Sequence, residues 1–212
     1  MMKKLILATV LAGLSTAAAA NVLVNNGYYV QGDVGYSKLN LKFDDEKIKD
    51  DDVSYTVAVG KDTGMVRYAL DYTNFGKIKR SDTYVMEFPS GAVKKRVHWG
   101  ELKAHSLGLS AIYDFETVSG FTPYVGGRLG INQVKVEESK VVTTTAPPSI
   151  TQETYYDSEK KTKVGFGVLA GAQYAINPQL AVDAGVEYNY LGKFEETKVH
   201  QYGAKVGLRY NF

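Results

Sequence analysis

The most regular feature of the chain is an alternation of apolar and polar side chains, which recurs in segments of roughly the 9–11 residues that a tilted membrane strand needs. From Tyr202 to Phe212, every second residue is apolar or aromatic, and the residues between are polar, charged or Gly. Successive side chains of a β-strand point to opposite faces, so this segment is predicted to be a strand with one apolar face. We expect the chain to end on this strand.

The same alternation predicts eight strands, at residues 28–39, 53–60, 66–75, 104–115, 123–132, 164–174, 180–190 and 202–212. Bacterial membrane barrels have an even number of strands, with short turns on one side and long loops on the other. The sequence therefore predicts an all-β fold: an eight-stranded antiparallel up-and-down transmembrane β-barrel. Its four long extracellular loops are expected at residues 40–52, 76–103, 134–162 and 191–199.

The N-terminal segment has the pattern of a secretory signal peptide. Lys3 and Lys4 form a basic start, Leu5 to Leu14 an apolar stretch, and Ala18 to Ala20 a small-residue cleavage site. A retained membrane anchor would need about 20 apolar residues, and this stretch is shorter. We expect cleavage after residue 20, which leaves residues 21–212 as a single barrel domain in the outer membrane of a Gram-negative bacterium.

Charge and composition exclude several classes of function. The formal net charge of +2 is carried by Lys3 and Lys4, so the exported chain is balanced and no nucleic-acid partner is expected. There is no Cys and there are three His, too few for a strong transition-metal site. No Ser lies two residues from a His on the same strand face, as a lipid-facing Ser–His pair would need. We expect no enzymatic activity and no cofactor or metal.

An acidic segment deserves separate mention, because carboxylates bind hard cations. Asp44, Asp45 and Glu46 are followed by Asp50 to Asp52. The segment lacks the spaced ligands and the Gly of a dedicated calcium loop. An acidic, solvated loop is the preferred interpretation.

Charged residues also occur at positions that face the barrel interior. Eight strands enclose a space just wide enough for side chains, and charges in such a space must be paired or solvated. Acids and bases are equal in number, which predicts an interior salt-bridge network; a selective pore lined by charge is the alternative. The residues are Asp33, Asp71, Asp183 and Glu187, with Arg67, Arg128, Lys205 and Arg209.

The second predicted loop is rich in basic residues. Such clusters bind polyanions, and exposed aromatic side chains anchor protein interfaces. The candidate ligand-binding residues are Lys77, Lys79, Arg80, Lys94, Lys95, Arg96 and Trp99, with Tyr84, Met86 and Phe88 nearby. The alternative is a loop that contacts only the anionic lipopolysaccharide beside it. The third loop has a nearly neutral composition and is expected to be mobile.

Four stretches resemble the opacity-protein family: Arg67 to Phe75, Ser110 to Phe115, Pro123 to Leu129 and Val182 to Gly192. The resemblance covers the strands and turns and includes several of the inward charges. It implies an eight-stranded outer-membrane barrel. Membrane lipid and lipopolysaccharide are its expected partners, and a monomer is expected because a closed barrel has no edge that demands a partner.

The same resemblance implies a surface adhesin or immune-evasion protein. Members of the family bind host cell-adhesion receptors, heparan sulfate or a complement regulator through their long loops. The loops of this chain follow no recognisable family pattern, so the resemblance transfers only the location of the site. A small porin-like passive channel and a purely structural barrel are the alternative functions.

Overall fold

The computed structural model describes residues 27–42, 47–146, 149–194 and 197–212. The expected signal peptide, residues 1–20, lies outside these ranges. In the described ranges, no helix is long and apolar enough to cross a membrane. The eight strands are β1 (Tyr28–Lys42), β2 (Lys47–Asp62), β3 (Val66–Glu87), β4 (Val93–Asp114), β5 (Phe121–Ala146), β6 (Ser149–Ala175), β7 (Leu180–Phe194) and β8 (Thr197–Asn211).

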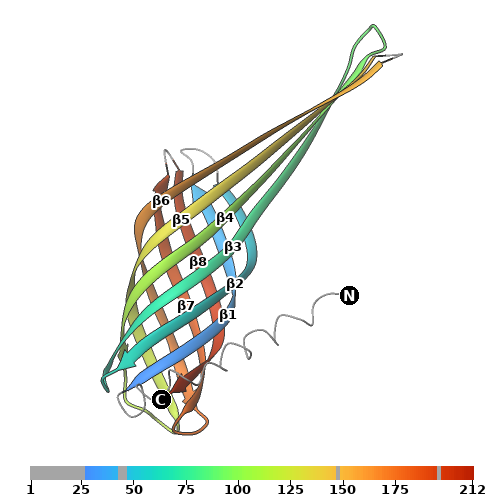
Figure 1. Cartoon of the computed structure of the whole chain (residues 1–212). Coiled ribbons are helices and arrows are strands. Elements are labelled where there is room, and N and C mark those ends of the chain that lie inside the picture. Colours follow the sequence, from blue (N-terminus) through green and yellow to red (C-terminus); the bar gives the residue numbers. More distant parts are fainter. Residues whose placement is uncertain (1–26, 43–46, 147–148, 195–196) are drawn as a thin grey trace.

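These strands form a closed antiparallel barrel in chain order. Each strand pairs with the next, and β8 closes the ring on β1, where Val34 lies opposite Val206. Figure 1 shows the ring with its short turns at one end. The eight-stranded up-and-down barrel expected from the alternation is confirmed.

The outer surface of the ring is an apolar belt. Side chains such as Val57, Leu109, Leu129 and Val168 are each more than half exposed and point away from the interior. A water-soluble monomer rarely exposes so large an apolar area, whereas a membrane barrel presents such a band to lipid. Tyrosines lie near both ends of the belt, as expected at a membrane interface; they include Tyr36, Tyr72, Tyr113, Tyr174 and Tyr202.

The two longest predicted loops are largely strands, and this part of the prediction is wrong. Strands β3 and β4 have 22 residues each, β5 has 26 and β6 has 27, against 15 for β1. Both faces of these extensions meet water, so they lack the alternation that marks a half-buried strand. Their ladder hydrogen bonds, not an apolar face, define them.

The extensions of β3 to β6 rise beyond the ring as a narrow, twisted sheet (Figure 1). We call this sheet the surface ribbon; it comprises residues 77–87, 93–103, 135–146 and 149–163. Long hairpins lie on the extracellular side of outer-membrane barrels. The predicted loops 40–52 and 191–199 also shrink, because β1 and β7 continue to Lys42 and Phe194.

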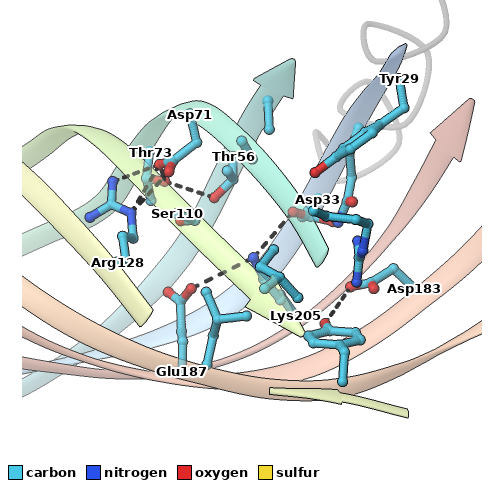
Figure 2. Close-up of a pocket in the computed structure, with 17 residues that line it drawn as sticks. Tyr29, Asp33, Thr56, Asp71, Thr73, Ser110, Arg128, Asp183, Glu187 and Lys205 are labelled. Atoms are coloured by element: carbon cyan, nitrogen blue, oxygen red, sulfur yellow. Dashed lines mark hydrogen bonds and ion pairs between the residues drawn. The ribbon is translucent and has the colours of Figure 1, made fainter. Parts of the chain in front are cut away.

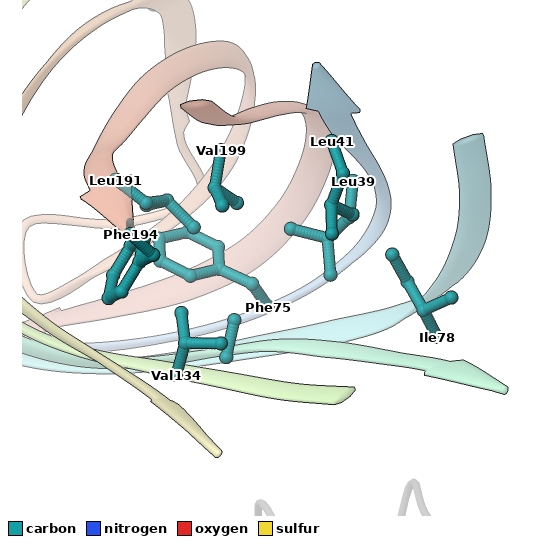
Figure 3. Close-up of a cluster of buried hydrophobic side chains, with 9 residues drawn as sticks. Leu39, Leu41, Phe75, Ile78, Val134, Leu191, Phe194 and Val199 are labelled. Atoms are coloured by element: carbon teal, nitrogen blue, oxygen red, sulfur yellow. The ribbon is translucent and has the colours of Figure 1, made fainter. Parts of the chain in front are cut away.

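The barrel interior has two layers. Near the ribbon, inward-facing apolar residues pack together as the inner apolar cluster (Figure 3). Its buried members are Leu39, Leu41, Phe75, Ile78, Ala104, Val134, Leu191, Phe194 and Val199. The layer toward the short turns is polar and charged. The cluster therefore lies across the extracellular end of the interior.

Candidate functional site

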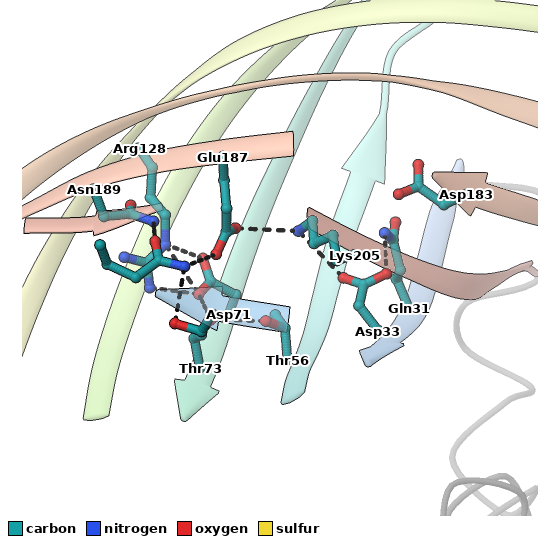
Figure 4. Close-up of polar contacts among 12 residues, drawn as sticks. Gln31, Asp33, Thr56, Asp71, Thr73, Arg128, Asp183, Glu187, Asn189 and Lys205 are labelled. Atoms are coloured by element: carbon teal, nitrogen blue, oxygen red, sulfur yellow. Dashed lines mark hydrogen bonds and ion pairs between the residues drawn. The ribbon is translucent and has the colours of Figure 1, made fainter. Parts of the chain in front are cut away.

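The interior charges form several separate groups. In the first, Arg128 of β5 lies 2.6 Å from Asp71 of β3, and both side chains are buried. Arg128 also donates to Ser106, and Thr73 donates to Asp71. The Arg128 guanidinium packs directly over Gly108, and a side chain at position 108 would collide with it. Each charge therefore has close polar partners, which is the condition for burying it (Figure 4).

The second group centres on Lys205 of β8. Its ammonium lies 3.3 Å from Asp33 and 3.7 Å from Glu187. Gln31 donates to Asp33, and Gln201 donates to Glu187. Figure 2 shows this lysine between the two carboxylates. The ammonium group of Lys205 therefore contacts both carboxylates.

The remaining predicted bases pair with acids outside the predicted set. Arg67 donates two hydrogen bonds, of 2.6 and 2.7 Å, to Asp114. Arg209 lies 2.5 Å from Asp62, and Asp183 accepts a hydrogen bond from Tyr124. Of the predicted set, Asp71 therefore pairs with Arg128, and Asp33 and Glu187 with Lys205, whereas Arg67 and Arg209 take partners outside it. Asp114 lies an even number of residues from the inward Ser106 and Ser110 on the same strand. The alternation therefore already indicated that its side chain faces the interior.

Little space is left between these groups. The cavity among Asp33, Arg67, Asp71, Arg128 and Lys205 has a volume of about 40 Å³. A buried water needs about 10–15 Å³ of such space and two to four polar partners, so the cavity has room for a few waters at most. The inner apolar cluster covers the end of the interior nearest the ribbon. In the described residues, side chains therefore occupy most of the interior at both levels and leave this small polar cavity between the charged groups.

The base of the ribbon carries a charged cluster on its outward face. Glu101 is buried and lies 2.6 Å from Lys103, 3.7 Å from Lys79 and 3.8 Å from Lys77. Lys103 also contacts Glu137, which pairs with Lys135 as well. Hydrogen bonds from Lys103 and Lys135 lower the pKa of Glu137 to about 2, and Lys103 also lowers the pKa of Glu101.

The seven candidate residues of the second predicted loop do not form one patch. Lys77 and Lys79 gather at Glu101, and the Lys79 ammonium lies 5.7 Å from the centre of the Trp99 ring. Arg80 pairs with Asp82 instead. Lys94, Lys95 and Arg96 lie at the far end of the β3–β4 hairpin, opposite Met86, Val85 and Tyr84. The two groups are separated along the hairpin, because Lys77 and Lys79 lie at its base and residues 94–96 lie near its turn.

The far end of the same hairpin is apolar and exposed. Tyr84, Val85, Met86 and Phe88 each expose between 42% and 56% of their surface. They are the neighbours of Lys94 to Arg96 across the ladder. We call residues 84–96 the hairpin tip.

Sequence reasoning missed a groove that joins the two hairpins. It has a volume of about 400 Å³ and is lined by residues that include Arg80, His98, Lys140, Tyr155 and Asp157. Gly100 leaves open space there, since nothing lies where its side chain would be. The third predicted loop was expected to be mobile, and no pattern in it indicated that β6 would lie beside β5.

The acidic segment at residues 50–52 is part of β2, so the prediction of a solvated loop is wrong for these residues. Asp52 accepts a hydrogen bond from the backbone N–H of Lys77, and Asp50 accepts one from Lys79. The acidic side chains therefore bind the first backbone N–H groups of β3 beyond the point where its pairing with β2 ends. Residues 44–46 lie outside the described residues. In the described part of the chain, no group of three or more acidic or His side chains could hold a metal ion.

Comparisons with known proteins agree with this architecture. A family model described as "Opacity family porin protein" matches residues 59–212. "Protein opa" of Haemophilus influenzae is 37% identical over 154 residues, which are 73% of this chain and 100% of that one. Opacity protein opA68 of Neisseria gonorrhoeae is 29% identical and covers 88% of this chain and 97% of its own.

A solved structure extends the likeness to three dimensions. The crystal structure of neisserial surface protein A matches with a TM-score of 0.57 and 28% identity, over 88% of this chain and 97% of that chain. The family places the barrel in the outer membrane of a Gram-negative bacterium, with the apolar belt in lipid. By family model, relatives and fold together, this chain belongs to the opacity family of outer-membrane β-barrel proteins.

Proposed function

We propose that the protein is a surface adhesin whose β3–β4 hairpin contacts a host molecule, with the barrel as its scaffold. The observation that carries the proposal is the hairpin tip, where exposed Tyr84, Met86 and Phe88 lie beside Lys94 to Arg96. Exposed aromatic and apolar side chains at the end of a projecting element are typical of interfaces. The family resemblance implies the same role for long surface segments.

The partner is a polyanion or a protein with an acidic surface. The tip is basic, and the cluster at Glu101 and Glu137 also has four ammonium groups for two carboxylates. Fields of this sign steer anionic ligands toward a surface. Heparan sulfate, a host receptor and a complement regulator are the candidate ligands, and the apolar tip favours a protein over a polysaccharide alone.

The passive-channel alternative has less support. An eight-stranded barrel is just wide enough to be filled by its own side chains, and here paired charges and the inner apolar cluster fill it. A purely structural barrel would not need an exposed apolar tip at the end of a 22-residue strand. No catalytic role is proposed.

The test is a matched pair of hairpin truncations. Asp82 lies opposite His98, so residues 83–97 can be replaced by Asn-Gly, a preferred two-residue turn. Val142 lies opposite Glu153, so residues 143–152 can be replaced in the same way as the control. Cells that express each variant are tested for binding to immobilised heparin and to host epithelial cells.

Loss of binding with the first truncation and retention with the second is expected. Replacing Lys94, Lys95 and Arg96 with Gln separates the two classes of partner. Binding to a polysaccharide falls with this variant and with added salt, whereas binding through the apolar tip falls with Tyr84→Ser and Phe88→Ser. Unchanged binding by the first truncation would overturn the proposal.

A further inference from the structure

Four lysines form a row across the base of the surface ribbon, with one lysine on each of the strands β3 to β6. Lys77 lies opposite Lys103, and Lys103 lies opposite Lys135. Lys135 in turn lies opposite Lys160. Neighbouring strands are about 4.8 Å apart, so this lysine row is about 14 Å long. Like charges directly opposite each other are unfavourable in a sheet, and other groups must therefore compensate for them.

The lysine row lies on the face of the sheet that continues into the apolar belt. The register from β4 to β6 is unbroken between the ring and the ribbon (Figure 1). Side chains four residues apart on a strand share a face. On β4, β5 and β6 the lysine is four residues from an exposed apolar side chain of the belt; these side chains are Leu107, Ile131 and Val164. The lysines therefore project from the same side of the molecule as the residues that contact lipid.

The spacing places the lysines at the level of the lipid headgroups. Four residues of a strand span about 13 Å, which is about 9 Å along the membrane normal for a strand tilted by about 45°. The headgroup region of one leaflet is about 5–8 Å thick, and the long side chain of a lysine can reach toward it. The row between the lysines and the belt is polar and consists of His105, Gln133 and Thr162. From the membrane outward, this face is therefore apolar, then polar, then cationic.

Carboxylates compensate for part of the positive charge. Glu101 and Glu137 lie one row farther from the membrane and opposite each other. Glu101 lies 2.6 Å from Lys103, and Glu137 contacts both Lys103 and Lys135. Two carboxylates face the four ammonium groups of the row, so a positive excess remains. An ammonium group has three N–H donors, which allows the same lysines to bind a second anion from the membrane side.

The acids are not spread evenly along the row. At its β3 end, Asp52 accepts the backbone N–H of Lys77. At its β6 end, Lys160 is exposed, and the next residue outward on the same face is Ser158, which carries no charge. Glu159 belongs to the opposite face of that strand. The positive excess is therefore greatest toward β5 and β6.

We propose that the lysine row binds the phosphate groups of lipid A, the phosphorylated and acylated disaccharide of the outer leaflet around the barrel. Lys103, Lys135 and Lys160 contact the phosphates, and the acyl chains lie against the apolar belt. Hydrogen bonds from ammonium to phosphate are charge-assisted, and basic clusters beside a membrane recognise anionic headgroups. The sugar hydroxyls lie at the level of Gln133 and Thr162, which can donate and accept hydrogen bonds. The site is independent of host binding, because its ligand belongs to the membrane of the protein itself.

Titration with purified lipid A tests the site. The folded protein in detergent micelles is titrated with lipid A that carries two phosphates, and native mass spectrometry gives the apparent dissociation constant. Replacing Lys103, Lys135 and Lys160 together with Gln is expected to weaken binding by about tenfold or more, since three charge-assisted contacts are lost. The matched control replaces residues 94–96 with Gln, which removes the same charge at the far end of the hairpin. Equal weakening in both variants would overturn the site.

Substitutions that keep or reverse the charge separate phosphate binding from folding. Replacing the same three lysines with Arg is expected to leave lipid A binding intact, because the charges remain. Lys160→Glu reverses the exposed end of the row and is expected to weaken binding severalfold in a normally folded barrel. Gel mobility of unheated and heated samples, together with circular dichroism, reports folding for every variant. Unchanged binding by a folded Lys160→Glu barrel would contradict the proposal.

The chemistry of the ligand is tested with related lipids. Lipid A with one phosphate is expected to bind severalfold more weakly than lipid A with two, and lipid A without phosphate is expected to bind no better to the unaltered protein than to the triple Gln variant. Phosphatidylglycerol carries a phosphate but lacks the disaccharide. Equally tight binding of phosphatidylglycerol would overturn the assignment to lipid A.

Removing a competing carboxylate gives a test with the opposite sign. Glu137→Gln frees Lys103 and Lys135 from one acid and is expected to tighten lipid A binding severalfold. Glu138→Gln, the adjacent position on the other face, is the matched control and is expected to have no effect. Unchanged or weaker binding by a folded Glu137→Gln barrel would contradict a site in which carboxylate and phosphate share the same ammonium groups. None of these variants alters the hairpin tip, so their failure would leave the adhesin proposal standing.

Discussion

At the scale of residues, the interior shows how a narrow barrel tolerates charge. Asp71 and Arg128 are both buried, and their mutual contact of 2.6 Å is supplemented by Thr73 and Ser106. Removing both charges from such a pair is often tolerated, whereas removing one leaves an uncompensated buried charge. The interior pairs therefore restrict the sequence more than they stabilise the barrel.

Asp71→Ala is expected to destabilise the barrel by about 3–5 kcal/mol, because Arg128 loses its carboxylate. The measurement is urea-induced unfolding of the protein in detergent micelles or vesicles. The double variant Asp71→Leu, Arg128→Leu is the control and is expected to regain much of the loss. If the single and double variants are equally unstable, the packing of the site and not the unpaired charge decides its stability.

At the scale of elements, each membrane strand presents one face to lipid, and Val168 lies in the middle of the β6 face with 58% of its surface exposed. Val168→Arg is expected to cost about 2–4 kcal/mol, the depth-dependent penalty of a charge at the bilayer midplane. Unfolding and refolding in lipid vesicles measures this cost. Thr162→Arg, on the same face but in the ribbon, is the control and is expected to be nearly neutral; an equal cost at both sites would contradict the position of the membrane.

The base of the ribbon is expected to respond to acid. Its two lysine contacts depress the pKa of Glu137 in the folded state to about 2, below the ordinary value of 4.5. A depressed carboxylate contributes its stabilisation above the ordinary pKa and loses it as pH falls through the depressed one. Nuclear magnetic resonance of the side-chain carboxyl carbon should give a midpoint near 2. Lys135→Gln should raise it, and a midpoint near 4.5 in the unaltered protein would show that the contacts do not persist in solution.

At the scale of the whole molecule, the protein combines a closed barrel with a projecting sheet. The inner apolar cluster and the paired charges lie in series along the interior. An apolar constriction excludes ions even where water can enter, because ions are not dehydrated without cost.

We therefore expect no steady ion conductance in planar bilayers that contain the purified protein. A sixteen-stranded porin in the same bilayers provides the positive control, since its wider barrel leaves an aqueous channel. Discrete openings that recur in independent preparations and disappear with denatured protein would restore the passive-channel function.

The sequence by itself determined the membrane barrel. Where one face of a strand meets lipid and the other meets the interior, apolar and polar residues must alternate, and segments such as Val66 to Phe75 carry that alternation directly. The same parity placed Asp71 and Arg128 inside, and it pointed to Asp114 as well. Local residue types decide these features, because the membrane imposes the same pattern on every strand.

Only the tertiary structure decided how far the strands continue and which residues meet. Beyond the membrane both faces are in water, so residues 77–87 and 149–163 form strands through ladder hydrogen bonds that no side-chain pattern records. Likewise, Arg67 meets Asp114 and Arg209 meets Asp62 because closure of the ring brings particular strand ends together. Parity assigns a residue to a face, but only register assigns it a neighbour.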